Sequence, residues 1–192
     1  MSGPDASTEG ERMLIGSDTS TLLIIDVQER LAPVMDDPRK VLRGCALLVH
    51  AATRLGIPVT ITEQYPKGLG PTMFDVRDLA PEGSTLVKTA FSCAAEPTVM
   101  ARLDGFAAAA RPGVVVAGIE AHVCVLQTAL GLKALGREVF VVTDACSSRH
   151  AESEAAAYRR MATVGVHLVT LEMVLFEWLG GREHPAFKEI HR

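Results

Sequence analysis

Cys124 is the residue of this chain with the clearest capacity for chemistry, because it stands where a predicted strand gives way to a predicted helix. The backbone N–H groups at a helix start favour a thiolate and can also stabilise a developing oxyanion. A free cysteine is otherwise a small, buried hydrophobic residue. Position alone therefore leaves two interpretations of Cys124, a nucleophile or a core residue.

Two residues that can exchange protons or balance charge stand at the ends of other predicted strands. Asp26 directly follows the apolar run 21–25, and Lys88 ends the run 84–88. An acid in such a position belongs to a cleft more often than it simply ends a strand. Lys88 taken alone is an exposed strand end, and it becomes a site candidate only because Asp26 and Cys124 are also present.

Strand and helix patterns alternate along the chain. Strands are predicted at 21–25, 58–62, 84–88, 114–118, 138–143 and 166–170, and helices at 38–55, 97–110, 124–135, 151–163 and 171–179, with a long loop at 63–81. The strands are β-branched and almost continuously apolar, as in a parallel sheet buried on both faces. The alternation predicts an α/β fold, a three-layer α/β/α sandwich with a six-stranded parallel sheet of order 3-2-1-4-5-6.

That strand order brings the candidate residues to one place. The first and fourth strands become neighbours where the winding reverses, and open parallel sheets bind ligands at this point, outside the carboxyl ends of the strands. Asp26 and Cys124 then border one crevice, and the long side chain of Lys88 is able to reach it from two strands away. The spacing therefore predicts a single site.

Composition excludes several classes of function. The chain has 192 residues, a net charge of −4, two Tyr and one Trp, and no basic patch with interleaved aromatic residues, so nucleic acid is not an expected partner. No apolar run reaches membrane-spanning length and the N-terminus lacks a signal-peptide core, so we expect a cytoplasmic protein without a membrane partner. Residues 1–19 are expected to form a disordered arm and residues 20–192 a single domain.

The other three cysteines are assigned to packing. No C-x-x-C pair occurs, which argues against a zinc ribbon or a thioredoxin motif. Cys45 and Cys93 are expected in the core. Cys146 follows the fifth predicted strand at the same end as the site, where it is either structural or a neighbour of the site.

Four segments carry a resemblance to a known family: 23–28 (LIIDVQ), 87–92 (VKTAFS), 116–125 (VAGIEAHVCV) and 143–148 (TDACSS). Together they resemble the isochorismatase-like cysteine hydrolases. Segments 63–70 (EQYPKGLG) and 184–188 (HPAFK) are similar to the isochorismatase domain-containing proteins within that superfamily. The resemblance covers roughly residues 20 to 190 and is more specific for the superfamily than for a substrate.

The resemblance implies a role for each matching position. Cys124 corresponds to the nucleophile, Asp26 to the acid/base that takes the thiol proton, and Lys88 to the third member of an Asp-Lys-Cys triad. It also implies a cis peptide bond between Ile119 and Glu120, which would aim the Glu120 N–H, together with that of Cys124, at an oxyanion. The metal-binding histidines of the related nicotinamidases have no counterpart in the loop at 63–81, so neither a metal nor another cofactor is expected.

These inferences lead to one main hypothesis and two alternatives. The main hypothesis is a covalent hydrolase of a small amide, ester or related C–N or C–O bond. The alternatives are a binding or scaffold protein without turnover, and a thiol redox protein for which Cys146 is the weak candidate for a resolving cysteine. Candidate pocket residues are Gln28, Tyr65, Phe91 and His122.

A Cys–His dyad is not expected, because residues two apart on a helix do not face each other. This excludes His122 as the base for Cys124 and leaves it as a residue that flanks the site. A homo-oligomer is expected from the resemblance and from the apolar stretch 174–179, although helix periodicity would equally place that stretch in the core of one subunit.

Overall fold

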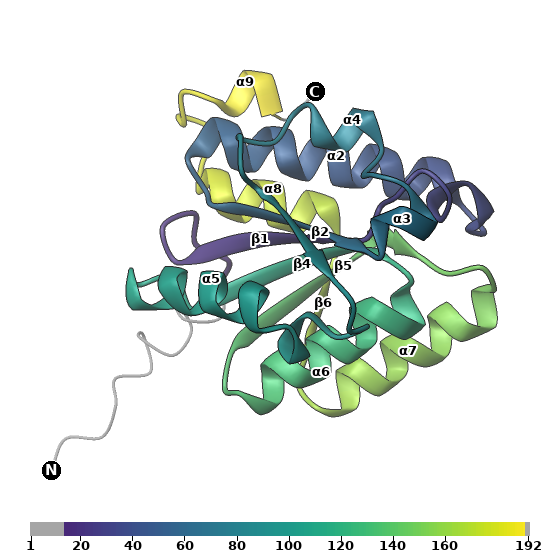
Figure 1. The fold of residues 1–192 in the computed structure, drawn as a ribbon. Coiled ribbons are helices and arrows are strands. Elements are labelled where there is room, and N and C mark those ends of the chain that lie inside the picture. Colours follow the sequence, from purple (N-terminus) through teal and green to yellow (C-terminus); the bar gives the residue numbers. More distant parts are fainter. Residues whose placement is uncertain (1–13, 191–192) are drawn as a thin grey trace, which may run out of the picture.

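A six-stranded parallel sheet forms the centre of the molecule in the computed structural model, which describes residues 14–190. The strands are β1 (Ser20–Ile25), β2 (Val59–Gln64), β3 (Thr85–Lys88), β4 (Gly113–Ile119), β5 (Glu138–Ser147) and β6 (His167–Val169). Their order is β3-β2-β1-β4-β5-β6 (Figure 1). The predicted fold class and strand order are confirmed.

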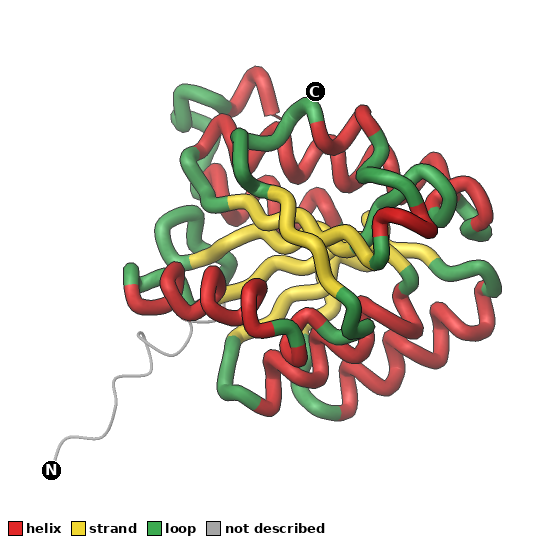
Figure 2. The backbone as a smooth tube through the Cα atoms, viewed as in Figure 1, coloured by secondary structure: helices red, strands yellow, loops and turns green. Residues whose placement is uncertain are grey.

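Helices cover both faces of this sheet. They are α2 (Pro38–Leu55), α3 (Pro66–Leu69), α4 (Phe74–Arg77), α5 (Pro97–Ala108), α6 (Leu126–Ala134), α7 (Ala151–Thr163), α8 (Leu171–Leu179) and α9 (Phe187–Ile190). The helices α2 and α8 lie on one face, and α5, α6 and α7 lie on the other (Figures 1 and 2). Short 3-10 turns occur at Ala32–Val34 and Cys93–Ala95, and a π-helical turn at Ala121–Val125 precedes α6.

Local sequence explains why the longest helix begins and ends where predicted. The Asp37 side chain accepts a hydrogen bond from the Lys40 N–H at 3.0 Å, and Pro38 occupies the first turn, where its missing N–H costs nothing. Gly56 ends α2 in the left-handed conformation, with a φ of 69°. These signals act over only a few residues, so they could be recognised without knowledge of the tertiary structure.

Two expectations about the chain ends need correction. Ile15 is buried in the core and its N–H donates to Glu177 Oε2 at 2.7 Å, so the boundary of the expected arm at residue 19 is wrong; residues 1–13 lie outside the described part.

In α8, four residues of the apolar stretch belong to the core: Val174, Leu175, Trp178 and Leu179. Only Met173 and Phe176 are exposed on this helix among its large apolar residues, so the stretch offers little surface for a partner.

The loop expected at 63–81 contains two short helices, α3 and α4. The Glu63 carboxylate braces this segment, because its Oε1 accepts hydrogen bonds from both the N–H and the hydroxyl of Thr72, at 2.7 and 2.8 Å.

Among residues 14–190, no helix combines the length and apolar composition that crossing a membrane requires.

Gly118 allows β1 and β4 to approach each other at the point where the winding reverses. It pairs with Ile25 and has a φ of +123°. A Cβ atom at this position would lie 2.1 Å from the Ile25 carbonyl oxygen, which is main chain and cannot move aside. A side chain here would therefore disturb the strand end that carries Asp26.

We expect Gly118→Ala to lower the free energy of unfolding by at least about 3 kcal/mol, because it combines backbone strain with a steric clash. The matched control is Gly105→Ala in α5, where an added Cβ would meet nothing within 4 Å. That change should be neutral or stabilising by about 0.5–1 kcal/mol. Urea unfolding measures both, and equal effects of the two substitutions would contradict the assignment.

Candidate active site

A buried ion pair joins the ends of β1 and β3. Lys88 Nζ lies 2.7 Å from Asp26 Oδ2, and both side chains are completely buried. Lys88 is the last residue of β3 and extends past β2, the strand between them, to reach the residue that follows β1. Asp26 has a φ of 54°, a left-handed conformation that aspartate tolerates better than most residues.

The Asp26 carboxylate interacts with three side chains, those of Thr62, Lys88 and Cys124. The Thr62 hydroxyl donates to Oδ1 at 2.8 Å. Oδ2 pairs with Lys88 Nζ, and the Cys124 thiol also lies within hydrogen-bonding reach of the carboxylate. Burial raises the pKa of Asp26 above its ordinary value, although Lys88 and Thr62 act in the opposite direction. A carboxylate with a raised pKa is a stronger base, which suits it to accept a proton.

Cys124 lies beside this carboxylate, inside the π-helical turn Ala121–Val125. The turn is closed by the Val125 N–H, which donates to the Glu120 carbonyl at 3.2 Å. Cys124 is 5% exposed, whereas Cys45, Cys93 and Cys146 have no exposed surface. It is therefore the most accessible thiol among the described residues.

The electrostatics of Cys124 differ from the expectation of a helix-start thiolate. Burial raises the pKa of the thiol well above its ordinary value, the Asp26 carboxylate raises it further, and Lys88 only partly opposes them. The helix start and Lys88, which favour a thiolate, are outweighed by the loss of water and by the adjacent acid, so the pKa of the thiol is raised rather than lowered. The resting site holds a thiol next to a base.

The peptide bond between Ile119 and Glu120 is cis in the structure. The Glu120 carboxylate, which is largely buried, accepts hydrogen bonds from the backbone N–H and Nε of Arg149 at 3.1 and 3.0 Å. Its carbonyl accepts from Val123 and Val125. The backbone N–H is the one group of Glu120 that can donate to an oxyanion, because its carboxylate and its carbonyl are acceptors.

The four residues expected to line the pocket have different positions. Tyr65 and Phe91 are 57% and 55% exposed, on the segments that follow β2 and β3. His122 Nδ1 is 2.9 Å from the Ser148 hydroxyl. Gln28 is fully buried and its amide binds backbone atoms of Gln64 and Gly70, so its polar atoms are engaged within the protein.

Sequence reasoning missed three residues that surround the ion pair. Thr62 and Gln64 bind Asp26 and Lys88 respectively, and Cys93, assigned only to packing, lies 3.9 Å from the Thr62 hydroxyl. The alternation of side chains along β2 could have revealed Thr62 and Gln64, because they share one face of the strand while Ile61 and Glu63 lie on the opposite face. Cys93, rather than Cys146, is the cysteine near enough to contribute to the raised pKa of Cys124.

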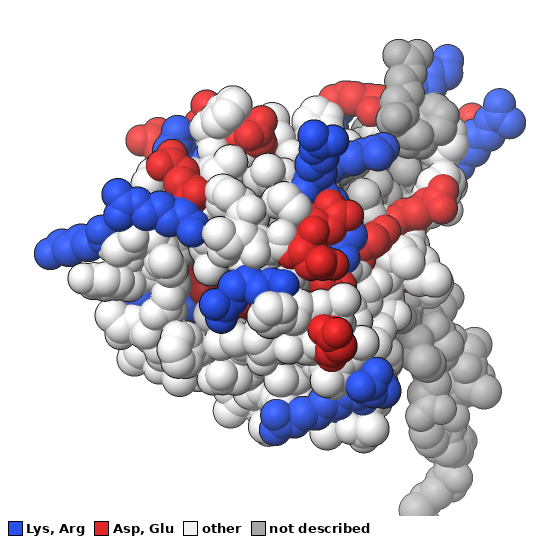
Figure 3. Space-filling view, turned by 90° about the vertical axis from the view of Figure 1, so that its right-hand side faces the viewer, with Lys and Arg blue, Asp and Glu red and all other residues white. Residues whose placement is uncertain are grey.

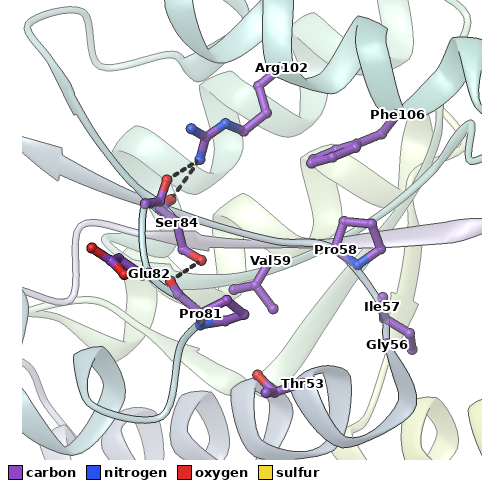
Figure 4. Close-up of a pocket in the computed structure, with 11 residues that line it drawn as sticks. Thr53, Gly56, Ile57, Pro58, Val59, Pro81, Glu82, Ser84, Arg102 and Phe106 are labelled. Carbon is purple, nitrogen blue, oxygen red and sulfur yellow. Dashed lines mark hydrogen bonds between the residues drawn. The ribbon is translucent and has the colours of Figure 1, made fainter.

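Three cavities in the described part lie away from these residues. One of about 360 Å³ lies at the amino ends of β2 and β3, where Arg102 donates to the carbonyls of Gly83 and Ser84 and Phe106 stands near Pro58 (Figure 4). The second cavity is lined by residues at the amino ends of β1 and β4, and the third by the segment that follows α8. The three side chains of the Asp26–Lys88–Cys124 cluster are buried in this conformation, and Cys124 is the least buried of them, at 5% exposure.

Charge and metal ligands give no competing site on this part of the chain. Acidic and basic side chains are intermixed on the face shown in Figure 3. Among residues 14–190, no group of three or more His, Cys, Asp or Glu side chains is arranged to hold a metal ion.

The comparisons with known proteins agree on one family and on the fold. A family model described as "Isochorismatase domain" matches residues 20–173. Isochorismatase domain-containing protein 1 of Danio rerio is 41% identical over 177 residues, 90% of this chain and 59% of that protein. Isochorismatase domain-containing protein 2 of Bos taurus is 39% identical over 185 residues, 94% and 84% of the two chains. The solved MAR1 ribonuclease from Caenorhabditis elegans is 37% identical, with a TM-score of 0.85 over 93% of this chain and 90% of that chain.

Breaking the buried ion pair should be costly, and removing both partners should not. We expect Lys88→Met to lower the free energy of unfolding by about 3–5 kcal/mol, since it leaves the Asp26 carboxylate without its counter-ion. Adding Asp26→Asn to Lys88→Met should restore most of that stability. The exposed pair Arg54–Glu189 is the control, and Arg54→Met should cost no more than about 1 kcal/mol. Additive effects of the two site substitutions would contradict a coupled pair.

Iodoacetamide should modify Cys124 before the other cysteines, because it is the only one with exposed surface. Its raised pKa means that the rate should keep rising from about pH 7 to about pH 9 without a plateau. Asp26→Asn removes a negative charge that raises the pKa, so the profile should move to lower pH. Peptide mass spectrometry follows each site, with urea-unfolded protein as the reference, and a plateau near neutral pH would oppose this description.

Proposed function

The chain belongs to the isochorismatase family, and on that premise we propose that it is a cysteine-dependent hydrolase of a small amide, ester or related C–N or C–O bond. The observation that carries the proposal is the interaction of the Cys124 thiol with the buried Asp26 carboxylate, which is itself paired with Lys88 at 2.7 Å. A nucleophile, a base and a fixed cation in contact are the parts that covalent catalysis needs.

In the first half of the reaction, Asp26 removes the proton from the Cys124 sulfur as that sulfur attacks the carbonyl carbon of the substrate. The new C–S bond leaves a negative charge on the carbonyl oxygen, which the N–H groups of Glu120 and Cys124 stabilise. Each such donor contributes about 2.7–4 kcal/mol in comparable sites. Lys88 keeps a positive charge next to the sulfur while the proton resides on Asp26.

In the second half, Asp26 returns the proton to the leaving nitrogen or oxygen as its bond to carbon breaks. The product of this step is a thioester on Cys124. Water then attacks the thioester carbon, giving its proton to Asp26, and the acid leaves as the sulfur is reprotonated. Acid/base assistance of this kind accelerates reactions by about 10²–10⁴.

One relative suggests a second candidate function, because the Caenorhabditis elegans structure is described as a ribonuclease. The net charge of −4 and the mixed charges on the face in Figure 3 do not favour a polyanionic substrate. We therefore place a small molecule first and include RNA among the substrates to be tested.

The assembly and location of the protein remain predictions. This chain spans 59% of the length of the Danio rerio relative, so the activity and partners of that longer protein are proposals for this one. We infer a homo-oligomer in the cytoplasm without nucleic acid, membrane, metal or cofactor partners.

A panel of small amides, esters, ureas and a single-stranded RNA tests the proposal. The wild-type protein should release product from at least one small substrate and form a mass adduct on Cys124 when quenched in acid. Cys124→Ala should abolish turnover and adduct, and Asp26→Asn should lower turnover by at least about 10²-fold because an amide accepts no proton. Cys45→Ala is the control, because Cys45 is a fully buried packing residue outside the site.

Other results would point elsewhere. Turnover that survives Cys124→Ala would overturn the proposal. Binding without turnover, unchanged by Cys124→Ala, would indicate a scaffold, and peroxide consumption coupled to a thiol reductant would indicate a redox protein. RNA cleavage that depends on Cys124 would replace the small-molecule assignment.

A further inference from the structure

The buried end of Lys88 is surrounded by hydrogen-bond acceptors. Besides Asp26 Oδ2 at 2.7 Å, Nζ lies 2.8 Å from Gln64 Oε1 and 3.0 and 3.1 Å from the carbonyls of Ala90 and Phe91. An ammonium group has three N–H donors and no acceptor, whereas a neutral amine has only two donors. Four oxygen atoms around one nitrogen therefore suit the charged form and fix its position.

Among these four oxygens, Gln64 Oε1 is the only one on a neutral side chain, and its orientation is determined by its own neighbours. Gln64 Nε2 donates to the Thr89 carbonyl at 2.7 Å, so the amide oxygen is the end that faces Lys88. The opposite orientation would place an NH₂ group against the ammonium and another oxygen against a carbonyl. The amide thus presents an acceptor to Lys88.

Gln28 holds the main chain of Gln64 from the other side. Its Oε1 accepts from the Gln64 N–H at 2.7 Å, and its Nε2 donates to the carbonyls of Gln64 and Gly70 at 3.1 and 2.7 Å. The Gln28 amide thus makes the hydrogen bonds to the Gln64 main chain that a neighbouring strand would make, at a level where β1 has already ended. Because Gln28 follows Asp26 by two residues, one short segment carries both the base and the brace.

We propose that Gln64 is a positioning residue that holds the Lys88 ammonium against Asp26 Oδ2, with Gln28 as its brace. The proposal rests on the proposed function, because the position of Lys88 matters for chemistry only if Asp26 and Cys124 react. Gln64 acts through Lys88 and is not assigned a contact with the substrate. It matters because Lys88 is the group that lowers the pKa of Cys124 against the effects of burial and Asp26.

The first test observes Lys88 itself and requires no substrate. Lys88 is completely buried, and the other lysines within residues 14–190 are not, so its ammonium protons should give one slowly exchanging signal in a lysine-selective ¹H–¹⁵N spectrum. Lys88→Met should remove that signal. Gln64→Met, which keeps the length of the side chain but lacks the acceptor, should speed exchange by about tenfold or more. Gln127→Met, at an exposed position in α6, should leave it unchanged.

The second test measures the consequence at the thiol. Gln64→Met and Lys88→Met should both slow alkylation of Cys124 at about pH 8, because each weakens the cation that favours the thiolate. If Gln64→Met folds poorly, Gln64→Asn provides the same comparison, since its shorter amide cannot reach both Thr89 and Lys88.

The outcomes separate this proposal from the proposed function. Slower alkylation and faster exchange in Gln64→Met, with Gln127→Met like the wild type, support it. If Lys88→Met slows alkylation and the Gln64 variants change neither measurement, Gln64 is not a positioning residue and the triad stands. If Lys88→Met also leaves alkylation unchanged, both the proposal and the assigned role of Lys88 are overturned.

Discussion

The burial of two opposite charges at the end of the sheet is the constraint on which this structure depends. Taking Asp26 and Lys88 out of water costs several kcal/mol for each ion, and the cost is recovered only where other groups complete their hydrogen bonds. The side chains of Thr62 and Gln64 and two carbonyls after β3 supply those bonds. Segments after β1, β2 and β3 are thereby held together around one pair of charges.

The same burial affects Cys124, the candidate nucleophile. Low polarity and an adjacent carboxylate raise the pKa of Cys124 and so favour its thiol form. Asp26, with its raised pKa, is matched to take that proton because the two groups compete for it in the same environment. An exposed thiolate would react with oxidants as well as substrates, whereas a closed thiol is protected.

Backbone geometry places these groups where their chemistry can operate. Gly118 lets β4 approach β1 closely, and the π-helical turn after the cis peptide bond sets Cys124 over the end of β1. Turns of this kind inside helices are frequent at functional sites. The three cavities described above lie elsewhere, so side-chain contacts rather than those cavities mark the candidate site.

The sequence by itself determined the layers, the strand order and the meeting of Asp26, Lys88 and Cys124, because apolar periodicity and strict alternation leave few ways to wind a parallel sheet. It did not determine the protonation of Cys124, the engagement of Gln28 or the burial of Ile15 and most of α8. These depend on desolvation and on partners that are distant along the chain, such as Gln28 with Gln64 and Ile15 with Glu177. Local pattern specifies which face of an element is buried, and only tertiary packing decides what each buried group meets there.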